Sequence, residues 1–211
     1  MQAPATRLLQ GIRRVPWITA GLVAISIALF QIAGPAPELF VYDRHSIAAG
    51  ELWRLFTGHW VHSDAGHATW NIAALALLGV LFERSLGWRL VAALAVGTVA
   101  IDAWMWWAMP QLERYCGLSG ILNALLAAGL IQVWRETRDP LLPLVGIGAV
   151  LKIVVEAAAG AAVFTHTAWP AVPVVHAIGL AAGPVVLCAR LGVRRSSPPV
   201  LGGLVARRRC G

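Results

Sequence analysis

Apolar residues follow one another along this chain in long runs, and short polar segments separate the runs. One helical crossing of a bilayer needs about 20 apolar residues, whereas a helix on the surface of a soluble domain alternates between apolar and polar faces. The pattern therefore predicts an all-α membrane protein, a bundle of six transmembrane helices. The expected spans are residues 17–34, 67–82, 88–109, 117–134, 141–164 and 171–191.

The composition agrees with a membrane location. Of 211 residues, 58% are hydrophobic and only 13% are charged, and the mean hydropathy is +0.70. A soluble domain of this length would need more polar residues to cover its surface. We expect one six-span domain at 17–192, preceded by a cytoplasmic segment at 1–16 and followed by a flexible basic tail at 193–211.

The net charge of +7 reflects basic residues that flank the apolar runs, not a basic stripe with interleaved aromatics. This placement argues against nucleic-acid binding and is typical of cytoplasmic flanks of membrane spans. One set of flanks carries most of the arginines, whereas the opposite set has only Arg44, Arg54 and Arg114. The positive-inside rule predicts both termini in the cytoplasm and segment 35–66 outside, which corresponds to the periplasm in a bacterial inner membrane.

Four polar side chains fall at one depth inside the predicted spans. His67 and Asn71 share one face of span two, Ser119 opens span four, and His176 lies just inside the outer end of span six. At 1.5 Å of rise per residue, all four lie within about 5–10 Å of the outer interface. Polar groups are costly in hydrocarbon, so their shared depth on three helices indicates a functional site.

These residue types suit acyl transfer. A serine hydroxyl becomes nucleophilic when an adjacent base takes its proton, and histidine is the usual base near neutral pH. We expect Ser119 and His176 to form this pair, and His67 and Asn71 to stabilise the oxyanion together with the backbone around Gly117. The sequence shows no third acid to orient His176, so it predicts a dyad and not a triad.

Glycines flank both members of the pair. Gly117 and Gly120 surround Ser119, and Gly179 and Gly183 follow His176. Small residues four apart let helix backbones approach closely in lipid. Spans four and six are therefore expected to pack together.

The ordered motifs resemble those of the rhomboid family of intramembrane proteases. The resemblance covers residues 51 to 183 and rests on the Trp53-Arg54 pair, His67-x-x-x-Asn71, Gly117-Leu118-Ser119-Gly120 and His176-x-x-Gly179-x-x-x-Gly183. It implies a Ser119–His176 dyad with His67 and Asn71 at the oxyanion, and a membrane-anchored protein substrate. No metal or organic cofactor is implied.

Within that family, the chain is most similar to the rhombosortase branch. The six-span core and Tyr115-Cys116-Gly117-Leu118-Ser119-Gly120 carry this finer resemblance. It implies a single-pass substrate with a C-terminal anchor, in which a Gly-Gly motif precedes a hydrophobic helix and a basic tail. Asn123 stands where many rhomboids have a tyrosine that stacks on the catalytic histidine. We expect Asn123 to support His176 by a hydrogen bond instead.

Other readings of the polar residues stay open. His59 and His62 near Asp64 hint weakly at a metal, and Cys116 is a rival nucleophile at the same level. Buried charges at Asp102, Lys152 and Glu156 suit a structural role, with Lys152 and Glu156 paired at i, i+4. The same charges would suit a transporter or channel. A catalytically inactive rhomboid-like binding protein is the remaining alternative.

Overall fold

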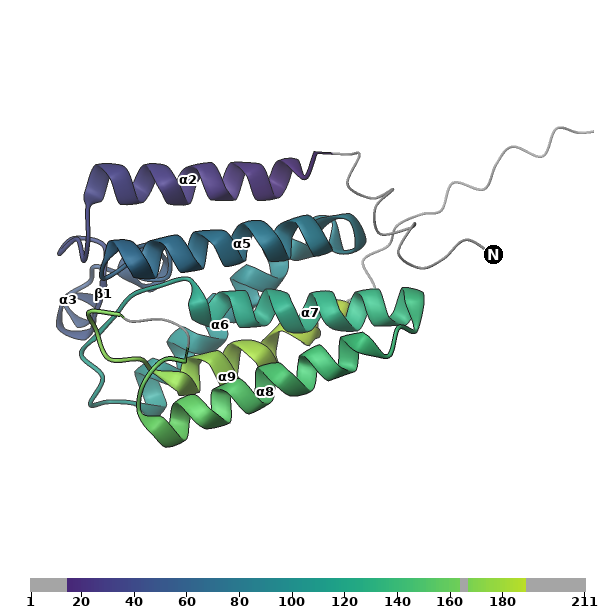
Figure 1. Ribbon diagram of the computed structural model, residues 1–211. Helices are drawn as coiled ribbons and strands as arrows, with labels where there is room; N and C mark the ends of the chain where they lie inside the picture. The colour runs from purple at the N-terminus through teal and green to yellow at the C-terminus, as the bar shows by residue number, and fades with distance from the viewer. Residues whose placement is uncertain (1–14, 164–166, 189–211) are drawn as a thin grey trace, which may run out of the picture.

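Long helices lie side by side along one direction in the computed structural model, which describes residues 15–163 and 167–188 (Figure 1). They are α2 (Trp17–Ala33), α5 (Ala65–Leu86), α6 (Arg89–Ala108), α7 (Ser119–Thr137), α8 (Leu141–Ala159) and α9 (Pro173–Ala182), which η1 (Gly183–Leu187) continues. The expected tail at 193–211 and most of the N-terminal segment at 1–16 lie outside the described residues.

Each of the six predicted spans coincides with one of these helices. Span five ends at Ala159 and not at residue 164, because Gly160 adopts a left-handed conformation with φ +64°. In the described part of the chain, α5, α6 and α8 are long and apolar enough to cross a membrane. The helices α2 and α9–η1 are apolar but shorter, so the count of six crossings stays a prediction.

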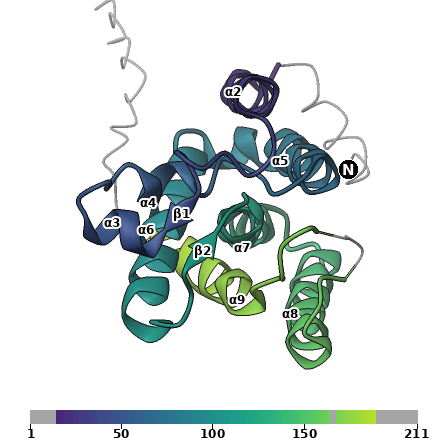
Figure 2. The same cartoon turned by 90° about the vertical axis from the view of Figure 1, so that its left-hand side faces the viewer.

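The central helix is α7, which contacts α5, α6, α8 and α9. Figure 2 views the bundle from the end that carries α3 and β1 and shows α7 surrounded by these neighbours. Its inward side chains Ile121 and Leu125 are fully buried, as are Leu75 of α5 and Ile101 of α6. Ser119 opens this central helix and therefore lies at the middle of the bundle's end.

A short folded segment covers the same end of the bundle. It contains β1 (Tyr42–Asp43), α3 (Arg44–Ala48) and α4 (Arg54–Thr57), and β1 pairs antiparallel with β2 (Arg114–Tyr115) in the register Tyr42 to Tyr115.

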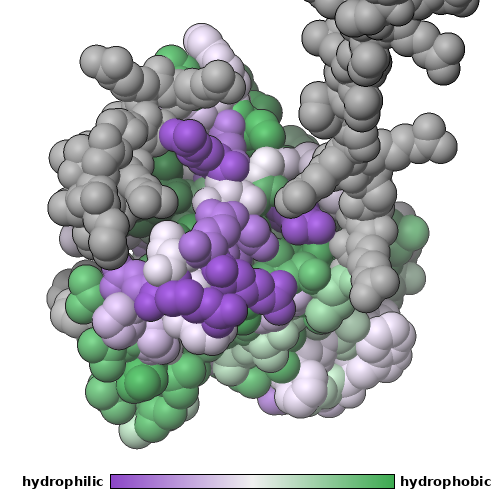
Figure 3. Space-filling view, turned by 90° about the vertical axis from the view of Figure 1, so that its right-hand side faces the viewer, coloured by the Kyte–Doolittle hydropathy of each residue, from purple (hydrophilic) through white to green (hydrophobic). Residues whose placement is uncertain are grey.

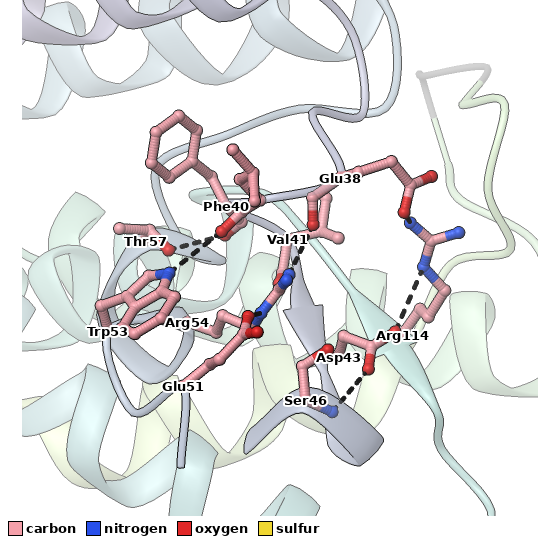
Figure 4. A network of polar contacts seen from close by, with 11 residues as sticks. Glu38, Phe40, Val41, Asp43, Ser46, Glu51, Trp53, Arg54, Thr57 and Arg114 are labelled. Atoms are coloured by element: carbon pink, nitrogen blue, oxygen red, sulfur yellow. Dashed lines mark hydrogen bonds and ion pairs between the residues drawn. The ribbon is translucent and has the colours of Figure 1, made fainter. Parts of the chain in front are cut away.

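Buried Arg54 holds this segment together. Its guanidinium donates to the backbone carbonyls of Glu38 and Val41 and pairs with the Glu51 carboxylate (Figure 4). The adjacent Trp53 donates from Nε1 to the Leu39 carbonyl. The Trp53-Arg54 motif thus has a structural role beside the site.

The opposite end is polar. Figure 3 shows hydrophilic residues gathered there, where α5 turns into α6 and α7 into α8. Arg84, Arg135 and Arg138 lie exposed on these turns. This is the end that the charge pattern predicts to face the cytoplasm.

Candidate active site

Ser119 and His176 meet at the end of the bundle that the folded segment covers. The Nε2 atom of His176 lies 2.9 Å from Ser119 Oγ. Ser119 is half-buried as the first residue of α7, and His176 on α9 is 7% exposed. The two residues are therefore in hydrogen-bond reach, as a nucleophile and its base require.

Gly179 of α9 and Gly183, the first residue of η1, make this contact possible. A Cβ added at Gly179 would collide with the carbonyl oxygen of Gly120, and one at Gly183 would collide with that of Ala124. Both carbonyls belong to α7. α9 and η1 thus touch α7 backbone to backbone along its first two turns, which agrees with the close approach predicted from the sequence.

Asn71 and His67 line the same site from α5. Asn71 is 6% exposed, and its Nδ2 atom has no hydrogen-bond partner. A buried donor without a partner is costly unless a ligand uses it. A Cβ at Gly117 would lie 3.4 Å from this Nδ2 and 2.6 Å from His67 Nε2, so both side chains converge on the turn before Ser119.

Gly117 leaves space for the His67 ring, but its backbone N–H is not available to an oxyanion. Its backbone N–H donates to the Gly58 carbonyl at 3.0 Å, and its own carbonyl accepts from the Tyr115 hydroxyl at 3.0 Å. The expectation that the Gly117 backbone supplies an oxyanion donor is therefore wrong. Its φ of +121° and the His67 ring beside it explain why glycine is needed here.

A short relay fixes the His67 ring. Asp64 N-caps α5 by accepting from the His67 N–H at 2.8 Å, and its other oxygen accepts from the Ser63 hydroxyl at 2.8 Å. Ser63 Oγ lies 3.0 Å from His67 Nδ1. Because the Ser63 proton goes to Asp64, His67 donates from Nδ1. Its Nε2 then carries a proton only when the ring is an imidazolium.

Asp64 also reaches the segment before α9, where it accepts from the Ala168 N–H at 2.8 Å. Burial raises the pKa of Asp64, but the N–H groups of Ala168 and His67 lower it further, so its net pKa lies below the usual range. The carboxylate that orders α5 therefore stays ionised at neutral pH.

An acid contacts His176, which the sequence analysis did not expect. Oε2 of Glu156 on α8 lies 3.0 Å from His176 Nδ1, and Glu156 is 1% exposed. Its Oε1 atom accepts from Lys152 Nζ at 2.5 Å. The predicted Lys152–Glu156 pair is present, but the expected lack of an acid beside His176 is wrong. The depth of Glu156 near the outer end of span five was the available signal.

Asn123 does not contact His176. Its Nδ2 donates to the Ser119 carbonyl within α7 at 2.9 Å. The proposed support of His176 by Asn123 is therefore wrong for this structure, because the amide is used one helical turn back on its own helix. Asn123 lines the cavity beside Ser119 instead.

A cavity of about 760 Å³ opens from these residues between α5 and α8. Ser119, His67 and Asn71 lie at one end, and apolar side chains such as Ala74, Leu78 and Leu126 line it further along the bundle. Its size suits a peptide segment more than a small ion. A second hollow of about 740 Å³, between α7, α8 and α9, is lined by apolar side chains alone.

The sequence also offered Cys116 as a rival nucleophile and His59 and His62 as possible metal ligands. Burial raises the pKa of Cys116 to about 12, so this thiol stays protonated and is a poor nucleophile at neutral pH. Burial, with His67 nearby, lowers the pKa of His62 to about 3, so its ring is neutral. His59 Nε2 lies 3.1 Å from Asp102. Within the described ranges, no cluster of His, Cys, Asp and Glu has the size of a metal site.

The Asp102–His59 pair also bears on the transporter alternative. Asp102 is bound to His59, whereas Lys152 is bound to Glu156, which also contacts His176. Each charge thus has its own partner, as structural or catalytic groups do.

A family model for the rhomboid domain matches residues 49–192, which is well over half of the chain. The match contains every residue placed above in the candidate site. The chain therefore belongs to the rhomboid family, whose members are serine intramembrane proteases that cleave membrane proteins within the bilayer. The family and the apolar helices identify it as a membrane protein. Among curated proteins, no significant match was found.

Proposed function

We propose that this chain is an intramembrane serine endopeptidase in which Ser119 is the nucleophile and His176 the general base. The observation that carries the proposal is the 2.9 Å contact between Ser119 Oγ and His176 Nε2 at the end of a membrane bundle. The unpartnered Nδ2 of Asn71 beside them supports it, because an oxyanion would satisfy that buried donor.

The reaction follows from these positions. As Ser119 Oγ bonds to the scissile carbonyl carbon, its proton moves to His176 Nε2 and the carbonyl oxygen becomes an oxyanion. Asn71 Nδ2 and the Ser119 N–H, which begins a helix and has no intrahelical partner, donate to that oxygen. His67 Nε2 adds a donor when its ring is charged. The amine then leaves with the proton from His176, and water releases the acyl group by the reverse steps.

The substrate we propose is a single-pass membrane protein cut near the periplasmic face of a bacterial inner membrane. The arginine distribution supports this orientation, with both termini cytoplasmic. The apolar cavity between α5 and α8 would receive the substrate segment, whose helix must open so that a carbonyl reaches Ser119. More narrowly, we propose a rhombosortase that processes C-terminal Gly-Gly sorting signals, on the strength of the motif around Ser119.

Covalent labelling tests the catalytic proposal. A fluorophosphonate probe should label the wild-type protein in detergent micelles and should not label Ser119→Ala. Equal labelling of the two proteins would contradict the assignment, as would an unlabelled wild-type protein that is folded. Mass spectrometry of secreted proteins from cells with wild-type protein or Ser119→Ala tests the substrate. New C-termini that depend on Ser119 and precede a hydrophobic helix are the expected result.

A further inference from the structure

Glu156 fixes which nitrogen of His176 carries the proton. A carboxylate can only accept, so the 3.0 Å contact between Glu156 Oε2 and His176 Nδ1 places the hydrogen on Nδ1. In a neutral imidazole, Nε2 is then a free acceptor. That atom is the one 2.9 Å from Ser119 Oγ. The acid thus prepares the ring to take the serine proton.

The other oxygen of Glu156 is fully occupied. Oε1 accepts from Lys152 Nζ at 2.5 Å and from the Val163 N–H at 3.0 Å. Glu156 is 1% exposed, and an isolated carboxylate would be costly at such a position. Lys152 supplies the balancing positive charge and Val163 the hydrogen bond. Both keep the carboxylate ionised and leave Oε2 directed at His176.

Resting on the proposed function, we propose that Glu156 is a positioning residue that completes a Ser119–His176–Glu156 triad, with Lys152 as the counter-ion of its carboxylate. Glu156 holds the productive tautomer of His176 and stabilises the imidazolium that forms when Ser119 gives up its proton. The three members come from three helices and follow one another along the chain: Ser119 on α7, Glu156 on α8 and His176 on α9. The other ionisable side chains that line this cavity are those of His67 on α5 and of Arg114, Tyr115 and Cys116 before α7.

Replacing Glu156 by glutamine should move the ring proton of His176 from Nδ1 to Nε2. Two donors, Lys152 Nζ and the Val163 N–H, claim the position of Oε1, so the amide oxygen of a glutamine belongs there. Its NH₂ group then faces His176 and donates to Nδ1. This places the ring proton on Nε2, where it cannot accept from Ser119. The analogous acid-to-amide change in soluble serine proteases lowers kcat about 10⁴-fold through the wrong tautomer.

The experiment compares fluorophosphonate labelling of full-length wild-type protein, Glu156→Gln and Glu156→Asp. Glu156→Gln should lower the maximal labelling rate about 10²-fold or more while the half-saturating probe concentration stays unchanged. Glu156→Asp keeps the charge and should recover most of the rate. Glu83→Gln is the matched control, because Glu83 also lies in the bundle but binds the Thr19 hydroxyl and the N–H groups of α2. It should label at the wild-type rate.

Histidine tautomers measured by ¹⁵N NMR provide the second readout. In wild-type protein, His176 should carry its proton on Nδ1, and in Glu156→Gln on Nε2, with His176→Ala used for assignment. A wild-type proton on Nε2 overturns the inference even if Glu156→Gln does not fold. Labelling of Glu156→Gln at the wild-type rate overturns it too. In that case a labelled wild-type protein and an unlabelled Ser119→Ala would leave the proposed protease function standing.

Discussion

The helices α9 and α8 both contribute a side chain to the candidate site, His176 beside Ser119 and Glu156 beside His176, but they are held in different ways. α9 and its continuation η1 pack on α7 backbone to backbone through Gly179 and Gly183. α8 lies at the edge of the bundle, and within its described length only Ile153 and Glu156 are buried. Side-chain contacts at one end hold it to the site. The proposed general base is therefore positioned by rigid packing, and its proposed acid partner by hydrogen bonds that a single substitution can remove.

The largest effect should follow from separating α9 and α7. Gly179→Ala places a methyl group on the Gly120 carbonyl, so α9 must move outward and His176 with it. A shift of about 1 Å in a catalytic group costs on the order of 10²-fold, so we expect at least that loss in labelling rate. We also expect about 1–3 kcal/mol of destabilisation from overpacking. Labelling kinetics and thermal unfolding check both.

Gly148→Ala is the control for this change on α8. No atom lies within 4 Å of a Cβ added at Gly148, although the residue lines the cavity. Its labelling rate should stay within about twofold of wild type, because glycine-to-alanine changes in an open helical position are neutral to stabilising. Equal losses in both variants would show that the α9 contact is not special.

The α5 side of the site should respond nearly as strongly to Gly117→Ala. The added methyl displaces the His67 ring from the turn before Ser119 and strains a backbone with φ +121°. The same methyl lies 3.4 Å from Asn71 Nδ2, the proposed oxyanion donor. Losing such a donor costs about 10²–10³-fold in rate, and we expect a labelling loss of this size while the Ser119–His176 contact persists. Gly50→Ala shares the strain, with φ +107°, but has no neighbour within 4 Å. An equal loss in Gly50→Ala would show that backbone strain, and not contact with the side chains beside Gly117, causes the effect.

A smaller effect, on the pH dependence of stability, should come from His62, whose ring contacts that of His67 from the loop before α5. Burial lowers its pKa to about 3, and neither ring nitrogen has a partner. Below about pH 6.5, His62 binds a proton in the unfolded chain, whereas in the folded state its ring stays neutral down to about pH 3. Stability should therefore fall as pH drops from about 6.5 toward 3, by up to about 1.4 kcal/mol per pH unit.

His62→Leu removes this contribution, so its free energy of unfolding should depend less steeply on pH between 6.5 and 5. Unfolding in detergent at several pH values measures the slope. His45→Leu, which replaces an exposed histidine of α3, controls for the loss of an imidazole as such. An unchanged slope in His62→Leu would mean that the His62 ring is not kept neutral by the fold.

The smallest effect should come from Cys116→Ala. Burial holds the pKa of this thiol at about 12, so it carries no nucleophilic thiolate at neutral pH. Fluorophosphonate labelling should stay within about twofold of wild type. A large loss, with Ser119 intact, would place the nucleophile at Cys116 and not on α7.

The sequence predicts how deep each side chain lies along its span. It does not predict in which direction that side chain points around the helix axis. The apolar runs located the helices, and shared depth brought together Ser119, His176, His67 and Asn71, because rise along a helix is fixed per residue. Glu156 has a similar depth, but its i, i+4 partner Lys152 already explained its charge. Only the packing of α8 beside α9 shows that it faces His176. Asn123 was misassigned for the same reason, since its direction around α7 decides its partner.

The order of the three groups along the chain has a consequence for biosynthesis. The proposed nucleophile on α7 is made first, its proposed acid partner on α8 next and its proposed base on α9 last. A chain whose synthesis or insertion has stopped after α7 holds a serine with no base beside it. On the proposed mechanism, proteolytic competence therefore arrives only with α9, and chains that lack α9 cannot cleave neighbouring proteins in the same membrane.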